Sequence, residues 1–140
     1  TNFAYHTKKI KIFGGSQLRP NIHISDMVDS YICLLNGKIS KVSNQIFNVG
    51  FENYSVEKLA LMVKENIQEN IELEYTKSDD NRSYHISSKK ISDILNFKPN
   101  KNINEAIKDL IVAFDKKLLS NTFNNDEYYN IKKMQKISLV

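Results

Sequence analysis

The chain has 140 residues, of which 41% are hydrophobic and 26% charged, and its formal net charge is +4, which fits one globular domain. No apolar stretch approaches the ~18 residues that span a bilayer, and no basic start followed by an apolar run marks a signal peptide. The single cysteine, Cys33, excludes an internal disulfide, and three histidines offer no zinc cluster, so we expect a cytoplasmic, metal-free protein with no membrane association.

The first part of the chain begins with a strand pattern. Lys9–Phe13 alternates polar and apolar residues, which is the period of a strand. Gln17–Ile24 is expected to be an irregular or extended connection, because Pro20 keeps Arg19 out of helical geometry. A helix should follow from Ser25 or Asp26, one of which would cap it, through Asn36, with one apolar face formed by Val28, Ile32 and Leu35.

The pattern of alternating elements continues to residue 119. In order, we expect a strand at Gln45–Val49; a helix capped by Ser55 with the apolar stripe Val56, Leu59, Ala60, Val63 and Ile67; a strand at Ile71–Thr76; a charged loop at Lys77–Asn81; a short strand at Tyr84–Ile86; and a short helix capped by Ser87 or Ser88. Asn102 and Glu105 form the sequence signature of a capping box. They open a longer helix with an inward face formed by Ile103, Ile107, Leu110 and Phe114.

Alternation of strands and helices predicts an α/β fold for residues 1–119, followed by a polar tail over residues 120–140. The glycine-rich turn that binds dinucleotides is absent, because Gly14-Gly15 leads into QLRP and no GxGxxG occurs. A domain that binds such a cofactor would therefore lie outside these 140 residues.

Arginine is rare in this lysine-rich chain, where Arg19 and Arg82 are the two arginines among 20 basic residues. A planar guanidinium binds phosphate with two parallel hydrogen bonds, and lysine cannot copy that geometry. Arg19 stands in a loop between a strand and a capped helix, and Arg82 follows the acidic pair Asp79-Asp80. The alternative is that both are solvated surface arginines. Dispersed lysines and no aromatic-basic stacking motif argue against nucleic-acid binding.

Three segments together resemble the C-terminal region of the extended short-chain dehydrogenases/reductases that act on nucleotide sugars. IFGGSQLRPNIHISD is similar to the family's strand, glycine, arginine and (V/I)H(V/I)xD stretch. IFNVG followed by YSV resembles its next strand and helix, and DDNRSYHISSKKISDILNFKP its DxRxY strand and following helix. The resemblance covers about residues 8 to 118. It implies the C-terminal portion of such an enzyme without its Rossmann core, and a last Rossmann-associated strand near residues 45–50.

The resemblance implies roles for individual residues. Arg19 and Arg82 match the arginines that contact the nucleotide's phosphates. Four further substrate-binding candidates are Phe13 beside the base, Gln17 on the same loop, and Asp80 and Tyr84, which flank Arg82 and would orient it. His23 is expected to pack or bond locally, and Asp26 to cap a helix.

No catalytic residue is assigned in this chain. The family's base is the tyrosine of a Tyr-x-x-x-Lys pair, whose lysine lowers the tyrosine pKa. That spacing occurs at Tyr5/Lys9, Tyr54/Lys58, Tyr128/Lys132 and Tyr129/Lys133. None lies upstream of the matched segments, where the family carries its pair, so all four are interpreted as structural.

The resemblance thus implies a UDP-glucose 4-epimerase-like enzyme, an NAD-dependent nucleotide-sugar epimerase or dehydratase. This chain would supply the part that binds the nucleotide diphosphate of the sugar. NAD would be bound by the missing N-terminal Rossmann domain, outside this chain, and a homodimer is left open. The alternative function is a stand-alone, non-catalytic module that binds nucleotide sugars.

Overall fold

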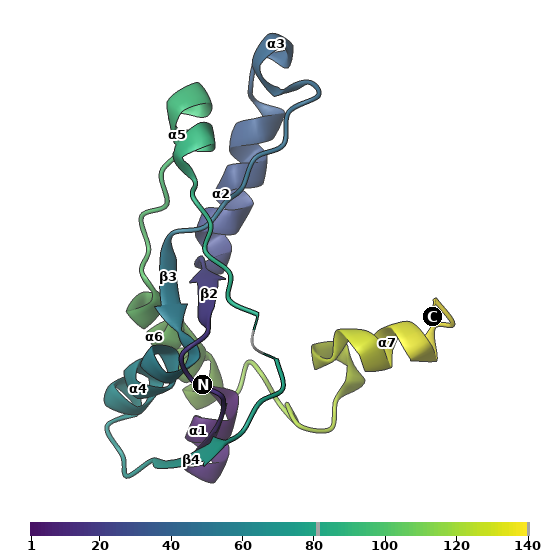
Figure 1. Ribbon diagram of the computed structural model, residues 1–140. Helices are drawn as coiled ribbons and strands as arrows, with labels where there is room; N and C mark the ends of the chain where they lie inside the picture. Colours follow the sequence, from purple (N-terminus) through teal and green to yellow (C-terminus); the bar gives the residue numbers. More distant parts are fainter. Residues whose placement is uncertain (81, 140) are drawn as a thin grey trace.

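Strands and helices alternate along the chain, as the apolar periods predict, and the α/β class is confirmed. The computed structural model describes residues 1–80 and 82–139 (Figure 1). Its helices are α1 (Asn2–Thr7), α2 (Ile24–Leu35), α3 (Ile39–Val42), α4 (Val56–Ile67), α5 (Lys89–Leu95), α6 (Ile103–Asp115), the short 3-10 helix η1 (Asp126–Tyr128) and α7 (Asn130–Lys136). Its strands are β1 (Lys9–Phe13), β2 (Leu18–Asn21), β3 (Glu52–Ser55) and β4 (Glu72–Thr76).

The strands form two separate two-stranded sheets. β1 pairs in parallel with β4, with Lys9 opposite Glu72 and Phe13 opposite Thr76. β2 pairs in antiparallel fashion with β3. Pro20, which lacks a backbone N–H, lies in β2, and an edge strand is where a sheet tolerates proline. The predicted loose connection at Gln17–Ile24 therefore contains a short strand.

The main core lies at one end of the molecule, between the β1–β4 sheet and helices α4 and α6 (Figure 1). Helix α4 contacts β1, α1 and α6, so it packs between the sheet and α6. The buried side chains of this region include Ile12, Ala60, Met62, Ile71 and Ile107. Leu110, which was expected to face inward, is exposed, so that prediction was wrong for one residue of the α6 stripe.

Side chains cap the two core helices where the sequence predicts. The Ser55 hydroxyl accepts a hydrogen bond from the Lys58 backbone N–H at 3.1 Å. Asn102 and Glu105 form a capping box: the Asn102 side chain accepts from the Glu105 backbone N–H at 3.1 Å, and the Glu105 carboxylate accepts from the Asn102 backbone N–H at 2.8 Å. Such caps satisfy N–H groups that the first helical turn leaves without partners.

Two predicted strands are not strands in this structure. Gln45–Val49 and Tyr84–Ile86 are extended segments outside both sheets. A strand needs a neighbouring strand to bond with, and among the described residues no strand pairs with Gln45–Val49; its Ile46 carbonyl accepts instead from the Lys90 side chain at 2.9 Å. Tyr84 has one such bond, from its N–H to the carbonyl of Leu18 at 3.1 Å, which is too little for a ladder.

The apolar face of α2 is open to solvent. Ile32 and Val28 are about half exposed, and Leu35 is 85% exposed. In Figure 1, α2 and α3 rise away from the α4–α6 core, and α5 lies beside them. A helix face of this kind is normally buried against another element.

Helix α1, near the N-terminus, packs against the residues that follow α6. α1 was not predicted, and its Phe3 ring lies 5.0 Å from the ring of Phe123. The buried Thr122 hydroxyl donates to the side-chain oxygen of Asn2 at 2.8 Å. The first residues after position 119 are therefore packed, whereas η1 and α7 extend to the side (Figure 1). The domain boundary at residue 119 stays a prediction.

Candidate functional site

Arg19 is the half-buried centre of the candidate site. It lies in β2, and its side chain is 29% exposed. One terminal nitrogen, Nη1, donates to the carbonyls of Leu18 at 2.9 Å and Arg82 at 2.6 Å. Its guanidinium lies 5.4 Å from the centre of the Tyr84 ring, within the range of a cation–π contact. The side chain is thus fixed by neighbours from two separate segments.

Asp80 joins the two arginines. Its carboxylate accepts two hydrogen bonds from Arg82, from Nε at 2.7 Å and from Nη2 at 2.9 Å. Its Oδ2 atom also lies 3.6 Å from Nη2 of Arg19. The Arg82 side chain is 72% exposed and lies open to solvent. We call Arg19, Asp80, Arg82 and Tyr84 the arginine cluster.

Backbone contacts bring the two halves of the arginine cluster together. The Leu18 N–H donates to the Ser83 hydroxyl at 2.9 Å, and the Tyr84 N–H donates to the Leu18 carbonyl at 3.1 Å. The segment after Arg82 therefore follows the start of β2. Strand β2 and the segment that contains Arg82 therefore meet, although they lie far apart in the sequence.

Charge pairing perturbs both members of the Asp80–Arg82 pair. Hydrogen bonds from the Arg82 side chain and backbone lower the Asp80 pKa to about 2. The same carboxylate raises the Arg82 pKa above its ordinary value. At neutral pH, Asp80 is therefore a carboxylate and both arginines are cations.

The Asp80 pKa can be measured directly. Carboxyl NMR titration should find the Asp80 midpoint near 2, and Arg82→Ala should return it toward the ordinary value of about 3.9. The Asp80 pKa is lower in the folded chain than in the unfolded chain. The Asp80–Arg82 pair therefore stabilises the fold at pH values above the ordinary Asp pKa of about 3.9, and this stabilisation is lost as the pH falls through about 2. A midpoint near 4 in the unmodified chain would contradict the pairing.

Gln17 and Phe13 lie beside the arginine cluster in sequence but do not join it. The Gln17 amide accepts from the Gly15 N–H and donates to the Phe13 carbonyl, both at 2.6 Å. A Cβ on Gly14, where φ is 77°, would lie 2.8 Å from the Gln17 amide. Gln17 therefore holds the turn between β1 and β2. Phe13 is exposed at the end of β1. Contact of Phe13 with the base and of Gln17 with the substrate stay predictions.

His23 and Asp26 have structural roles. His23, not Ser25 or Asp26, is the N-cap of α2, and its other ring nitrogen lies 3.1 Å from Asp109. Asp26 is 2% exposed and accepts from the backbone N–H groups of Asn100 at 3.2 Å and Lys101 at 2.9 Å. The expected cap at Asp26 was wrong, because its carboxylate instead ties α2 to the loop before α6.

Two of the four Tyr-x-x-x-Lys tyrosines, Tyr5 and Tyr54, have pKa values shifted away from activation. The Tyr54 hydroxyl donates to Glu52 at 2.8 Å, and this bond raises the Tyr54 pKa. A bond to Asp115 raises the pKa of Tyr5 in the same way. A tyrosine that acts as a base needs a lowered pKa, which is the opposite direction.

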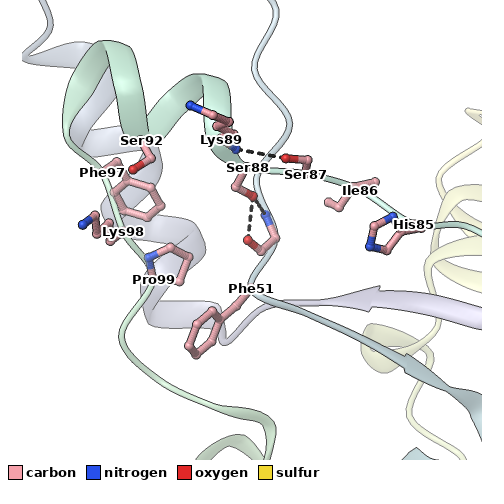
Figure 2. Close-up of a pocket in the computed structure, with 11 residues that line it drawn as sticks. Phe51, His85, Ile86, Ser87, Ser88, Lys89, Ser92, Phe97, Lys98 and Pro99 are labelled. Carbon is pink, nitrogen blue, oxygen red and sulfur yellow. Dashed lines mark hydrogen bonds between the residues drawn. The ribbon is translucent and has the colours of Figure 1, made fainter.

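A pocket that the sequence did not predict lies between the start of α5 and the loop before α6 (Figure 2). It has a volume of about 470 Å³, and its walls include Phe51, His85, Lys89, Phe97 and Lys98. The Ser88 hydroxyl donates to the Gly50 carbonyl at 2.6 Å and accepts from its N–H at 2.8 Å, closing one side (Figure 2). Two motif segments of the sequence contain Gly50 and residues 85–99, but no sequence signal shows that they enclose a pocket, because only the folded chain brings them together.

Residues 1–80 and 82–139 contain no group of three or more histidine, cysteine or acidic side chains that could hold a metal ion. Within the same residues, no helix is both long enough and apolar enough to cross a membrane.

The fold is shared with solved enzymes. L-threonine dehydrogenase from Phytophthora infestans has a TM-score of 0.73 at 13% identity, over 83% of this chain and 39% of that enzyme. UDP-glucose 4-epimerase from Thermotoga maritima, solved with UDP-glucose, has a TM-score of 0.71 at 22% identity, over 82% and 38%. UDP-glucose 4-epimerase from Bifidobacterium longum, in complex with NAD+ and UDP, has a TM-score of 0.60 at 15% identity, over 71% and 32%.

These enzymes are extended short-chain dehydrogenases/reductases, so the resemblance read from the motifs is confirmed as a likeness of fold. The chain spans about two fifths of the length of the first two enzymes. No protein-family model and no curated protein matches the sequence.

Proposed function

We propose that this chain is the substrate-binding part of an NAD-dependent nucleotide-sugar epimerase or dehydratase of the UDP-glucose 4-epimerase type. Arg19 and Arg82 would hold the pyrophosphate of the sugar nucleotide. The observation that carries the proposal is the arginine cluster, in which the two arginines of the chain lie on one carboxylate. The shared fold and the order of the three motif segments support it.

The geometry of the two guanidiniums suits a diphosphate. Arg82 is open to solvent, and Arg19 is held by carbonyls and the Tyr84 ring, so little side-chain freedom is lost when a ligand binds Arg19. A guanidinium offers parallel N–H groups to phosphate oxygens. Binding the diphosphate far from the reacting carbon would position the sugar for chemistry elsewhere.

The chemistry itself would be supplied by residues and NAD outside this chain. When bound, NAD would supply hydride transfer to and from the sugar, while this chain would hold the diphosphate in place. Phe13, at the end of β1, would pass beside the base. None of the 140 residues would act as a catalytic residue.

An uncovered apolar surface supports a partner domain. It comprises α2, where Leu35 is 85% exposed, and the unpaired segment Gln45–Val49, where Ile46 is 83% exposed. A segment outside both sheets of this chain can add to the edge of another sheet, although the Ile46 carbonyl already accepts a hydrogen bond from the Lys90 side chain at 2.9 Å. The solved enzymes with this fold have about three fifths of their length outside the matched part. We propose a preceding Rossmann domain as the occupant, and a homodimer stays a prediction.

Polar substitutions on α2 test that surface. Changing Ile32 and Leu35 together to glutamine should lower the free energy of unfolding by no more than about 1 kcal/mol, because Leu35 is mostly exposed and Ile32 is half exposed. The same change should lower binding of an apolar dye. The fully buried Ile91, changed to alanine, should cost about 2–5 kcal/mol in the same urea titration. A large loss in the glutamine variant would show that α2 is part of this chain's own core.

Turnover and calorimetry test the function. The chain incubated with NAD and UDP-glucose should give no product, because it has no GxGxxG dinucleotide turn and no Tyr-x-x-x-Lys pair upstream of the matched segments. Turnover would overturn the proposal. Micromolar binding of UDP to the chain alone would instead favour a stand-alone module that binds nucleotide sugars. A reading frame upstream with GxxGxxG and Tyr-x-x-x-Lys would establish the enzyme class.

A further inference from the structure

A carboxylate occupies the position where an anion bound by both arginines would lie. Asp80 takes the two parallel N–H groups of Arg82, at 2.7 and 2.9 Å, which are the groups that a phosphate would use. The same carboxylate lies 3.6 Å from Arg19. A phosphate bridging the two guanidiniums would therefore compete with Asp80 for the same donors.

The electrostatics of the cluster explain why such a carboxylate is favoured between the two arginines. The Asp80 carboxylate lies 2.7 Å from the Arg82 guanidinium and 3.6 Å from that of Arg19, so the two cations are held close together. Like charges at short range repel, and one intervening carboxylate neutralises one of them. Asp80 stays ionised throughout the neutral range.

Displacing Asp80 would cost little. The Asp80 side chain is 39% exposed, and ion pairs that are open to water contribute little to stability. It lies at the end of the exposed, polar loop that follows β4. Its backbone N–H is bonded only locally, to the Ser78 hydroxyl at 3.1 Å. The carboxylate can rotate into water without unfolding a core element.

We propose that Asp80 is an internal placeholder for the ligand's phosphate, which the sugar nucleotide displaces when it binds. This inference rests on the proposed function, since it presumes that Arg19 and Arg82 bind the diphosphate. Competition from Asp80 makes the affinity of the site for the diphosphate lower than two unpaired guanidiniums would give. Release of product is correspondingly assisted, because Asp80 returns to the arginines. If Asp80 only oriented Arg82, its loss would weaken binding.

The sign of one substitution separates these roles. Asp80→Asn removes the competing charge, and Asp79→Asn removes the same charge from the neighbouring exposed residue, which has no ion pair among the described residues. UDP is titrated into the full chain at low salt and followed by NMR. The chain contains two arginines, so their Nε–H signals report each guanidinium separately. Inorganic pyrophosphate, as a second probe, isolates the phosphate contribution.

We expect Asp80→Asn to bind UDP and pyrophosphate about five- to tenfold more tightly than the unmodified chain, and Asp79→Asn to change affinity by less than about twofold. Equal or weaker binding by Asp80→Asn, with the arginine signals still shifting, would overturn the placeholder and leave the pyrophosphate assignment standing. Failure of millimolar UDP to shift either arginine signal in all three proteins would overturn both.

Discussion

Replacing Arg19 and Arg82 together by lysine in the complete enzyme is expected to raise the Michaelis constant for the nucleotide sugar by about ten- to a hundredfold. Lysine keeps the charge but loses the paired N–H groups. A hydrogen bond to a charged group contributes about 1.5–3 kcal/mol, and losing part of it at each position gives this range. Steady-state kinetics over a range of substrate concentrations measures the effect.

A matched change distinguishes the cluster from bulk charge. Lys108→Gln with Lys116→Gln removes two exposed cations from α6 and its end, where neither side chain pairs with an acid among the described residues. This variant should change the Michaelis constant by less than about twofold at physiological salt. If the arginine-to-lysine enzyme behaved like this control, the pyrophosphate assignment would be wrong.

Replacing Asp26 by alanine is expected to lower the free energy of unfolding by about 2–4 kcal/mol. The carboxylate is buried and accepts from two backbone N–H groups, at 2.9 and 3.2 Å. Removing it leaves those donors without a partner, and each lost partner of a buried group costs about 1–3 kcal/mol. Urea denaturation monitored by circular dichroism gives the difference.

The control lies one turn further along the same helix. Asp29 is exposed, and its change to alanine should alter stability by no more than about 0.5 kcal/mol. Asp26→Asn keeps one acceptor oxygen and should fall between the two. An Asp26→Ala chain as stable as Asp29→Ala would mean that Asp26 does not tie α2 to the loop before α6.

The sequence predicted elements best where the signal is local. The alternation in Lys9–Phe13 and the capping box at Asn102 depend on neighbours within a few residues, and both are present. Gln45–Val49 has an equally good apolar pattern but no strand to pair with, so pattern alone was insufficient. The α1 helix was missed because aromatic packing against Phe123, far along the chain, stabilises it.

The same division holds for the candidate site. Arginine rarity and motif order selected Arg19 and Arg82, and the structure brings them together. The Gln17 bonds to Gly15 and Phe13 are local, but no pattern in the sequence indicates them. The approach of Asp80 to Arg19 could not be predicted, because it depends on how two segments far apart in the sequence meet. The pocket beside Ser88 was missed for that reason too.

The parallel pairing of β1 with β4 has a consequence for how the chain acquires its structure. Lys9 pairs with Glu72, so β2, α2, β3 and α4 all lie within the loop that this pair closes. Closing a long loop costs entropy before any contact compensates for it, and high contact order slows folding. We expect α4 and α6 to acquire structure early and the β1–β4 ladder to form last. In a stopped-flow experiment, mutations in the ladder should then mainly speed unfolding.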